Sequence, residues 1–160
     1  MGINSSPFDK FYPGGELVKT SREVYGYYNG AYICVNNPVP GIYKNCQVKV
    51  AVSKLSDLAI SEVKEALAAE SGLKRYYLSC DMKEHSVTVT LKQCLTPIET
   101  VRHLQEATDL VIGVLETRGV SSGCEICGTP GEVSFEQLRE DAVRTALCPA
   151  CLAGMKRKKN

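Results

Sequence analysis

The chain has 160 residues, of which 44% are hydrophobic, and its formal net charge at pH 7 is +1. This length allows a domain of about 100 residues together with a small metal module. The near-zero net charge excludes a polycation that coats nucleic acid, and charged residues interrupt each apolar stretch before it could span a bilayer. No charged-then-apolar signal peptide opens the chain, so we expect a cytoplasmic protein.

Residues 1–22 contain several prolines and glycines without a sustained hydrophobic period, so we expect a flexible N-terminal arm. The next two segments, 23–28 and 31–35, are predicted to pair as antiparallel strands, because Asn29-Gly30 between them is a two-residue hairpin signal. Four tyrosines in this stretch are expected to pack on the sheet, and a base-stacking platform is the alternative. They are Tyr25, Tyr27, Tyr28 and Tyr32.

The next elements follow from the hydrophobic pattern. Three apolar residues, Ile60, Val63 and Leu67, recur at helical spacing. They predict a helix over 56–71, with Gly72 placed for a left-handed cap. Other segments alternate apolar and polar residues, which is typical of half-buried strands. The predicted strands cover 46–52, 75–80 and 86–92, with a turn over 81–85.

A second, longer helix has a clear start in the sequence. Thr96 can cap it, Pro97 suits its first turn, and Glu99 lies where a capping box needs an acidic side chain. The helix is predicted to run to Arg118, before Gly119, over about 33 Å. Its apolar stripe consists of Ile98, Val101, Leu104, Thr108, Val111, Ile112 and Leu115.

This order of elements predicts an α+β fold. Strands linked as hairpins make a mostly antiparallel sheet, and two amphipathic helices can cover one of its faces. A small four-Cys module follows. We expect three parts: a flexible arm over 1–22, an α+β domain over 23–119, and a zinc-binding module with a basic tail over 120–160.

Two C-x-x-C pairs near the end of the chain, Cys124 with Cys127 and Cys148 with Cys151, are separated by a twenty-residue insert. Each pair can bring two thiolates to one metal, and together they make the tetrahedral S4 set that zinc prefers. We therefore predict one Zn²⁺ per chain, with iron as the alternative. Four protein ligands leave no open position for water, so the zinc is expected to be structural. Because the module holds few apolar residues, the metal would supply about 10 kcal/mol of its folding free energy.

Four further cysteines are expected to be reduced core residues, because a free cysteine packs as a small hydrophobe. Disulfides or a redox role are the alternatives. These cysteines are Cys34, Cys46, Cys80 and Cys94. His85, in a turn, and His103, on the polar side of the long helix, are expected at the surface. The sequence has no nucleophile–base motif and no phosphate-binding glycine loop, so we do not expect an enzyme.

The C-terminal residues form a compact basic tail. It could contact nucleic-acid phosphates or an anionic membrane surface, and a solvated, frayed end is the interpretation we favour. The tail consists of Lys156, Arg157, Lys158 and Lys159. At the other end, residues 1–6 formally match the N-myristoylation pattern, which has meaning only in a eukaryotic or viral protein.

The four-Cys region resembles the treble-clef and zinc-ribbon families over about 121–158. The resemblance lies in a C-x-x-C-G knuckle, a short hairpin that begins at Gly131, and a Cys-Pro-Ala-Cys pair at a helix start. The layout of the whole chain is also similar to cytosolic N-terminal regions of uncharacterised membrane proteins from Gram-positive bacteria. That similarity implies a membrane segment beyond the module, with 156–159 as its positive-inside flank.

For function, the sequence favours a non-catalytic zinc-binding protein that acts as an interaction or regulatory module with a protein partner. A nucleic-acid-binding zinc ribbon that uses the basic tail is the alternative. A redox sensor that uses the four remaining cysteines is a third hypothesis.

Overall fold

The computed structural model describes residues 8–9, 11–13, 16–20, 22–36, 45–55, 57–70, 75–94, 96–138 and 144–159. The strands in this part of the chain are β1 Leu17–Lys19, β2 Glu23–Tyr28, β3 Ala31–Asn36, β4 Cys46–Ala51, β5 Tyr77–Lys83, β6 Ser86–Leu91, β7 Ser134–Glu136 and β8 Thr145–Leu147. The helices are α1 Asp57–Ala69, α2 Pro97–Thr117 and α3 Pro149–Lys159.

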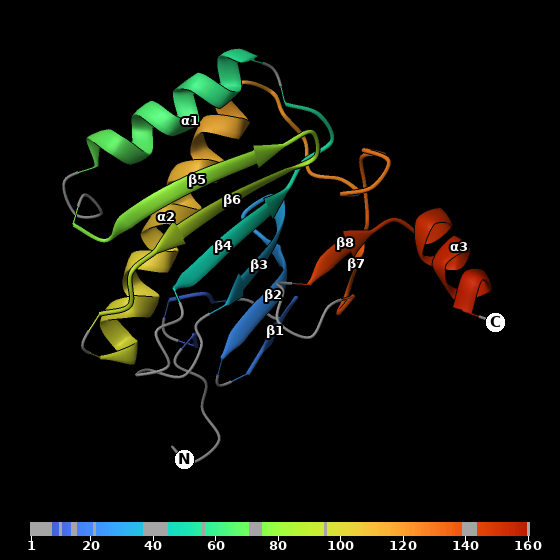
Figure 1. Cartoon of the computed structure of the whole chain (residues 1–160), viewed down its shortest axis with the longest axis horizontal. Coiled ribbons are helices and arrows are strands. Elements are labelled where there is room, and N and C mark those ends of the chain that lie inside the picture. Colours follow the sequence, from blue (N-terminus) through green and yellow to red (C-terminus); the bar gives the residue numbers. More distant parts are fainter. Residues whose placement is uncertain are drawn as a thin grey trace.

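Strands β1 to β6 form one antiparallel sheet in the order β1-β2-β3-β4-β6-β5 (Figure 1). Helix α2 packs against β4, and α1 packs against α2 and β5, so both helices cover the same face. Alternate residues of β4, Cys46, Val48 and Val50, point into this core and are buried. The predicted α+β fold is confirmed.

The two hairpins show how local sequence sets the register. Asn29 and Gly30 have φ values of 48° and 88°, the positive values that a type I′ turn requires, and they join β2 to β3 as predicted. The β5–β6 turn is shorter than the predicted 81–85. Because Lys83 already pairs with Ser86, the turn contains only two residues between the strands.

Helix α2 begins where its sequence signal lies. The Thr96 hydroxyl accepts a hydrogen bond from the Glu99 amide at 3.2 Å, and Gly119 follows the helix with φ 69°. The predicted stripe is buried from Val101 to Leu115. Ile98 is an exception at 57% exposure. It lies in the first turn, and helical periodicity does not reveal how far the layer beneath a helix extends.

The expectation of a flexible arm over 1–22 has to be corrected for the described residues. Phe8 and Tyr12 are fully buried in the core, and the Tyr12 hydroxyl lies 2.9 Å from the Thr108 hydroxyl of α2. Tyr12 also packs on the Tyr28 ring, and β1 adds an edge strand beside β2. A large aromatic ring buries about 150–250 Å², so two of them can hold a segment in place without a hydrophobic period.

On the other face of the sheet, here called the module face, the described residues of the four-Cys module (120–138 and 144–159) pack against β2, β3 and β4. The side chains of the module face alternate with those that point into the core. Ala51 shares one buried cluster with Val133 and Ala146 of the module, and Phe135 packs beside it. The module face is formed by Glu23, Tyr25, Tyr32, Cys34, Lys49 and Ala51. The sheet is therefore sandwiched between the two helices and the module.

Candidate metal centre

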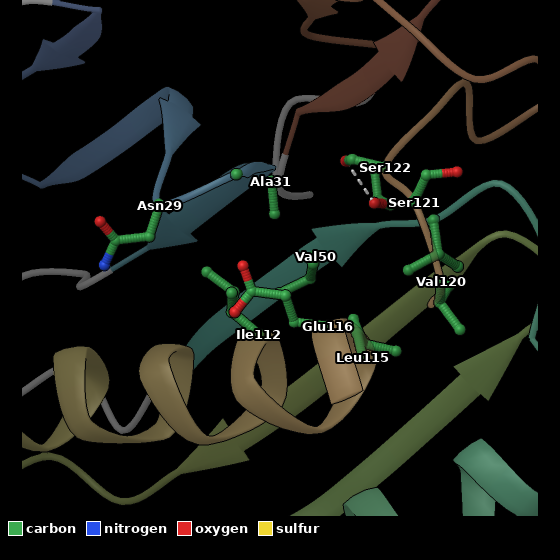
Figure 2. Close-up of a pocket in the computed structure, with 12 residues that line it drawn as sticks. Asn29, Ala31, Val50, Ile112, Leu115, Glu116, Val120, Ser121 and Ser122 are labelled. Carbon is green, nitrogen blue, oxygen red and sulfur yellow. Dashed lines mark hydrogen bonds between the residues drawn. The ribbon is translucent and has the colours of Figure 1, made fainter. Parts of the chain in front are cut away.

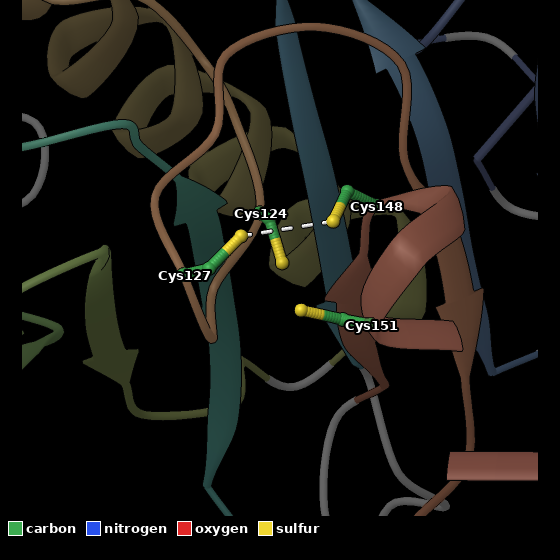
Figure 3. Close-up of side chains that lie close together, drawn as sticks. All are labelled: Cys124, Cys127, Cys148 and Cys151. Atoms are coloured by element: carbon green, nitrogen blue, oxygen red, sulfur yellow. Dashed lines mark hydrogen bonds between the residues drawn. The ribbon is translucent and has the colours of Figure 1, made fainter. Parts of the chain in front are cut away.

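The four predicted ligands converge at one point (Figure 3). The Sγ atoms of Cys124, Cys127, Cys148 and Cys151 all lie within 4.8 Å of one another. Those of Cys127 and Cys148 are 3.6 Å apart, close to the roughly 3.8 Å expected between two thiolates at about 2.3 Å from one tetrahedral zinc. The four cysteines are thus positioned to bind one metal ion, and the donor set fits zinc.

The knuckle that carries the first two ligands depends on Gly128. Its φ is 77°, and its amide donates to the Cys124 carbonyl at 2.9 Å, which closes the turn. The Ile126 amide then points at the Cys124 sulfur at 3.4 Å. A Cβ on Gly128 would lie 2.6 Å from the Ser53 carbonyl oxygen and 2.4 Å from Cε1 of His85. Glycine is therefore required both for the backbone angle and for the close approach to the sheet.

The local hydrogen bonds favour thiolates at the first pair. Hydrogen bonds from Thr129 lower the pKa of Cys127 to about 6. Burial alone would raise the pKa of Cys124, but backbone amides directed at its sulfur lower it. Burial and the neighbouring sulfurs raise the pKa of Cys151 to about 12. Four thiolates so close together repel one another, so a cation is needed to hold all four deprotonated.

A buried ion pair joins the knuckle to the sheet. Lys49, on the module face of β4, places Nζ 3.0 Å from Oε2 of Glu125, and the two side chains are only 8% and 11% exposed. The same carboxylate oxygen accepts the Ala146 amide of β8 at 2.7 Å. Sequence analysis did not single out either residue. A lysine in an alternating strand is typical of a solvated position, and only the docked module buries it.

Three further contacts fix the module against the sheet. The Ser122 hydroxyl donates to the Ala51 carbonyl at 2.6 Å and accepts the Tyr32 amide at 2.9 Å. Arg144 donates from Nε to Glu23 Oε1 at 3.0 Å. The short link at 120–123 is thus bonded directly to β3 and β4.

Two of the four tyrosines, Tyr25 and Tyr32, pack under the module. Phe135 of β7 lies 5.8 Å from the Tyr25 ring and 6.5 Å from the Tyr32 ring, measured between centroids. The Arg144 guanidinium carbon lies over the Tyr25 ring, 4.4 Å from its centroid. Tyr27 stays 42% exposed. This packing matches the favoured interpretation, because Tyr25 and Tyr32 contribute to docking.

A small cavity of about 30 Å³ lies between α2, β4 and the β2–β3 hairpin (Figure 2). Its walls include Val50 and Ile112, and it has room for about one water molecule. An open depression beside it is bordered by Asp109 and Glu116. Asp109 accepts a hydrogen bond from the Tyr28 hydroxyl at 2.9 Å, so this carboxylate holds the hairpin to the helix.

The remaining cysteines are free thiols. Cys34 on the module face and Cys46 in the core are both fully buried, and burial raises the pKa of each to about 12. Cys80 and Cys94 are partly exposed. The predicted burial is therefore confirmed for the first two, and their reduced state stays a prediction. The backbone of the basic tail belongs to α3, whereas the side chains of Lys156 to Lys159 lie outside the described residues.

Both histidines are more buried than predicted. His103 is only 6% exposed and stacks on Tyr76, with ring centroids 4.3 Å apart. The His85 side chain is 13% exposed and lies against Gly128. The knuckle covers His85 through Gly128. Tyr76 and Cys94 cover His103. Turn propensity and helical periodicity do not indicate which distant segments will bury a side chain.

A comparison of the chain with protein-family models, curated proteins and solved structures found no match. The resemblance to treble-clef and zinc-ribbon modules therefore rests on the cysteines and their surroundings. Among the described residues, no helix combines the length and the apolar content that crossing a membrane requires.

Proposed function

We propose that the chain is a non-catalytic zinc protein in which one structural Zn²⁺, held by Cys124, Cys127, Cys148 and Cys151, keeps the module docked on the sheet. The docked unit serves as an interaction or regulatory module. The observation that carries this proposal is the convergence of the four Sγ atoms, all within 4.8 Å of one another. The ion pair between Lys49 and Glu125 ties the ligand turn to the sheet.

The donor set supports zinc. Four thiolates suit Zn²⁺, a d10 ion that has no geometric preference of its own and is held tetrahedrally by such sets. Iron can occupy the same set of ligands. A knuckle, the β7–β8 hairpin and a last ligand in the first turn of α3 follow the order of elements typical of treble-clef modules. Zinc bound in this way contributes to folding, because four protein ligands leave no position for a reacting group.

The closed set of four protein ligands supports a role other than catalysis at the metal. Four cysteine ligands have to be kept reduced to bind zinc, which suits a reducing compartment and supports a cytoplasmic location. The similarity to cytosolic regions of Gram-positive membrane proteins stays a prediction, as does the existence of a protein partner.

Elemental analysis of the purified chain, combined with thiol mapping before and after chelation, tests the metal. We expect one zinc per chain and four ligand cysteines that become reactive when zinc is removed. Iron in place of zinc, or ligand thiols that react equally fast before chelation, would contradict the proposal.

Retention on a nucleic-acid column tests the alternative function. We expect the zinc-loaded chain to elute at low salt. Salt-sensitive retention that disappears when the basic tail at 156–159 is neutralised would instead support nucleic-acid binding.

A further inference from the structure

A second thiol site lies at the start of α2, remote from the four clustered cysteines in the sequence. Sγ of Cys94, in the segment after β6, is 3.1 Å from Nδ1 of His103 in the second turn of α2. His103 is 6% exposed, whereas Cys94 is partly exposed. A nucleophilic atom that solvent can reach therefore contacts a buried imidazole.

Surrounding contacts fix this pair in place. The Cys94 amide donates to the Thr100 hydroxyl at 2.9 Å, and that hydroxyl donates to the carbonyl of the N-cap residue Thr96 at 3.0 Å. The Tyr76 ring stacks on the imidazole with an interplanar angle of 27°. The helix start thus holds the sulfur while the tyrosine fixes the plane of the base.

Burial keeps both groups of the pair in their neutral forms. Burial raises the pKa of Cys94 and lowers the pKa of His103. The charged groups that face the pair partly offset one another, since Glu99 raises both pKa values and Arg102 lowers both, while Glu106 raises that of His103. Near neutral pH the pair therefore rests as a thiol beside a neutral imidazole, and Nδ1 lies close enough to take the thiol proton at the moment the sulfur attacks.

We propose that Cys94 is a hydroperoxide-reactive thiol and that His103 is its general base. As Sγ attacks one peroxide oxygen, the thiol proton moves to Nδ1, an S–O bond forms and the O–O bond breaks. The departing oxygen takes this proton and leaves as water or an alcohol, and the cysteine becomes a sulfenic acid. The sulfur loses two electrons and the peroxide gains them. A hydroperoxide is small enough to reach a thiol that is only partly exposed.

The three cysteines of the sheet, Cys34, Cys46 and Cys80, lack this arrangement. Cys34 and Cys46 are fully buried, so an oxidant cannot reach them in the folded protein. Cys80 is partly exposed like Cys94, but the charged groups around it are Lys64 and Asp81. Cys80 is therefore an internal control in the same chain, with similar access and no imidazole at its sulfur.

Trapping sulfenic acid with dimedone in the zinc-loaded full chain, followed by peptide mass mapping, tests the proposal. After addition of hydrogen peroxide we expect Cys94 to be labelled at least about tenfold faster than Cys80. His103→Gln should slow labelling of Cys94 by about 100-fold, the range that general-base catalysis contributes, and leave Cys80 unchanged. His85→Gln removes the other imidazole and should leave the Cys94 rate unchanged. Zinc release is followed in parallel with a chromophoric chelator. It distinguishes oxidation of the metal ligands from oxidation of Cys94.

Two results would overturn the proposal: equal labelling of Cys94 and Cys80 in the wild-type chain, or an unchanged Cys94 rate in folded His103→Gln. Labelling of Cys34 and Cys46 would reveal an unfolded variant. In that case the wild-type comparison of Cys94 with Cys80 decides alone.

Discussion

Lys49 and Glu125 form an ion pair between the sheet and the turn that carries the first two metal ligands, with Nζ and Oε2 3.0 Å apart. Both side chains are almost completely buried. Glu125 lies between Cys124 and Cys127 in sequence, so its carboxylate cannot move far without moving the ligands. Metal binding and docking of the module are therefore linked through one side chain.

Glu125→Gln should lower the free energy of unfolding of the zinc-loaded protein by about 3 kcal/mol, because it leaves the Lys49 charge buried without a partner. Lys49→Met should cost a comparable amount by leaving the carboxylate unpaired. The double variant should lose clearly less than the sum of the two single losses. Equilibrium unfolding in urea at saturating zinc measures the cycle, and strictly additive losses would show that the pair does not couple module and sheet.

Chelation of the metal should expose Cys34 and leave Cys46 protected. The two thiols are equally buried and have similarly raised pKa values, but Cys34 lies on the module face and Cys46 in the core beneath the helices. If zinc keeps the module docked, its removal should speed alkylation of Cys34 at least about tenfold. Mass mapping after a timed pulse of alkylating reagent measures both rates. Equal exposure of the two would mean global unfolding, and no change in either would mean that docking does not need the metal.

Gly128→Ala should weaken both folding and metal binding. The residue has φ 77°, and a Cβ there meets the Ser53 carbonyl oxygen at 2.6 Å. Gly131 offers a matched control, since its φ is 121° and a Cβ at that position meets nothing within 4 Å. We expect Gly131→Ala to cost about 1 kcal/mol from backbone strain alone, and Gly128→Ala about 3 kcal/mol. Thermal unfolding and competition with a chromophoric zinc chelator provide the comparison, and equal costs would rule out the close approach as the cause.

The metal ligands could be predicted because their chemistry is local. A C-x-x-C spacing brings two sulfurs together through one turn, and a second copy needs only a hairpin to deliver it. The Asn29-Gly30 turn and the Thr96 cap were predictable for the same reason, since each is decided within four residues.

What could not be predicted depends on contacts distant in sequence. Lys49 has the strand position of a solvated residue until a module 76 residues further along covers it. Phe8 and Tyr12 sit in a segment without periodicity, and only the core provides the cavity that their rings fill. The burial of His103 likewise comes from Tyr76, a residue on the other side of β5 and β6 in the sequence.

The stability of the protein should fall in mild acid partly because of His103. Burial, the largest influence, lowers the pKa of this imidazole in the folded protein. The unfolded chain therefore takes up the proton first as the pH falls below about 6.5, while the folded chain does so only at lower pH. The contribution of His103 is complete above pH 6.5 and is lost as the pH drops through the folded-state pKa, by at most about 1.4 kcal/mol per pH unit. Acid also releases zinc, so the comparison needs a variant that keeps the metal site unchanged. Urea unfolding of wild type and His103→Gln at pH 7.5, 6.5 and 5.5, with zinc in excess, should show a steeper loss for the wild type. Parallel pH profiles would mean that His103 is as easily protonated in the folded protein as in the unfolded chain.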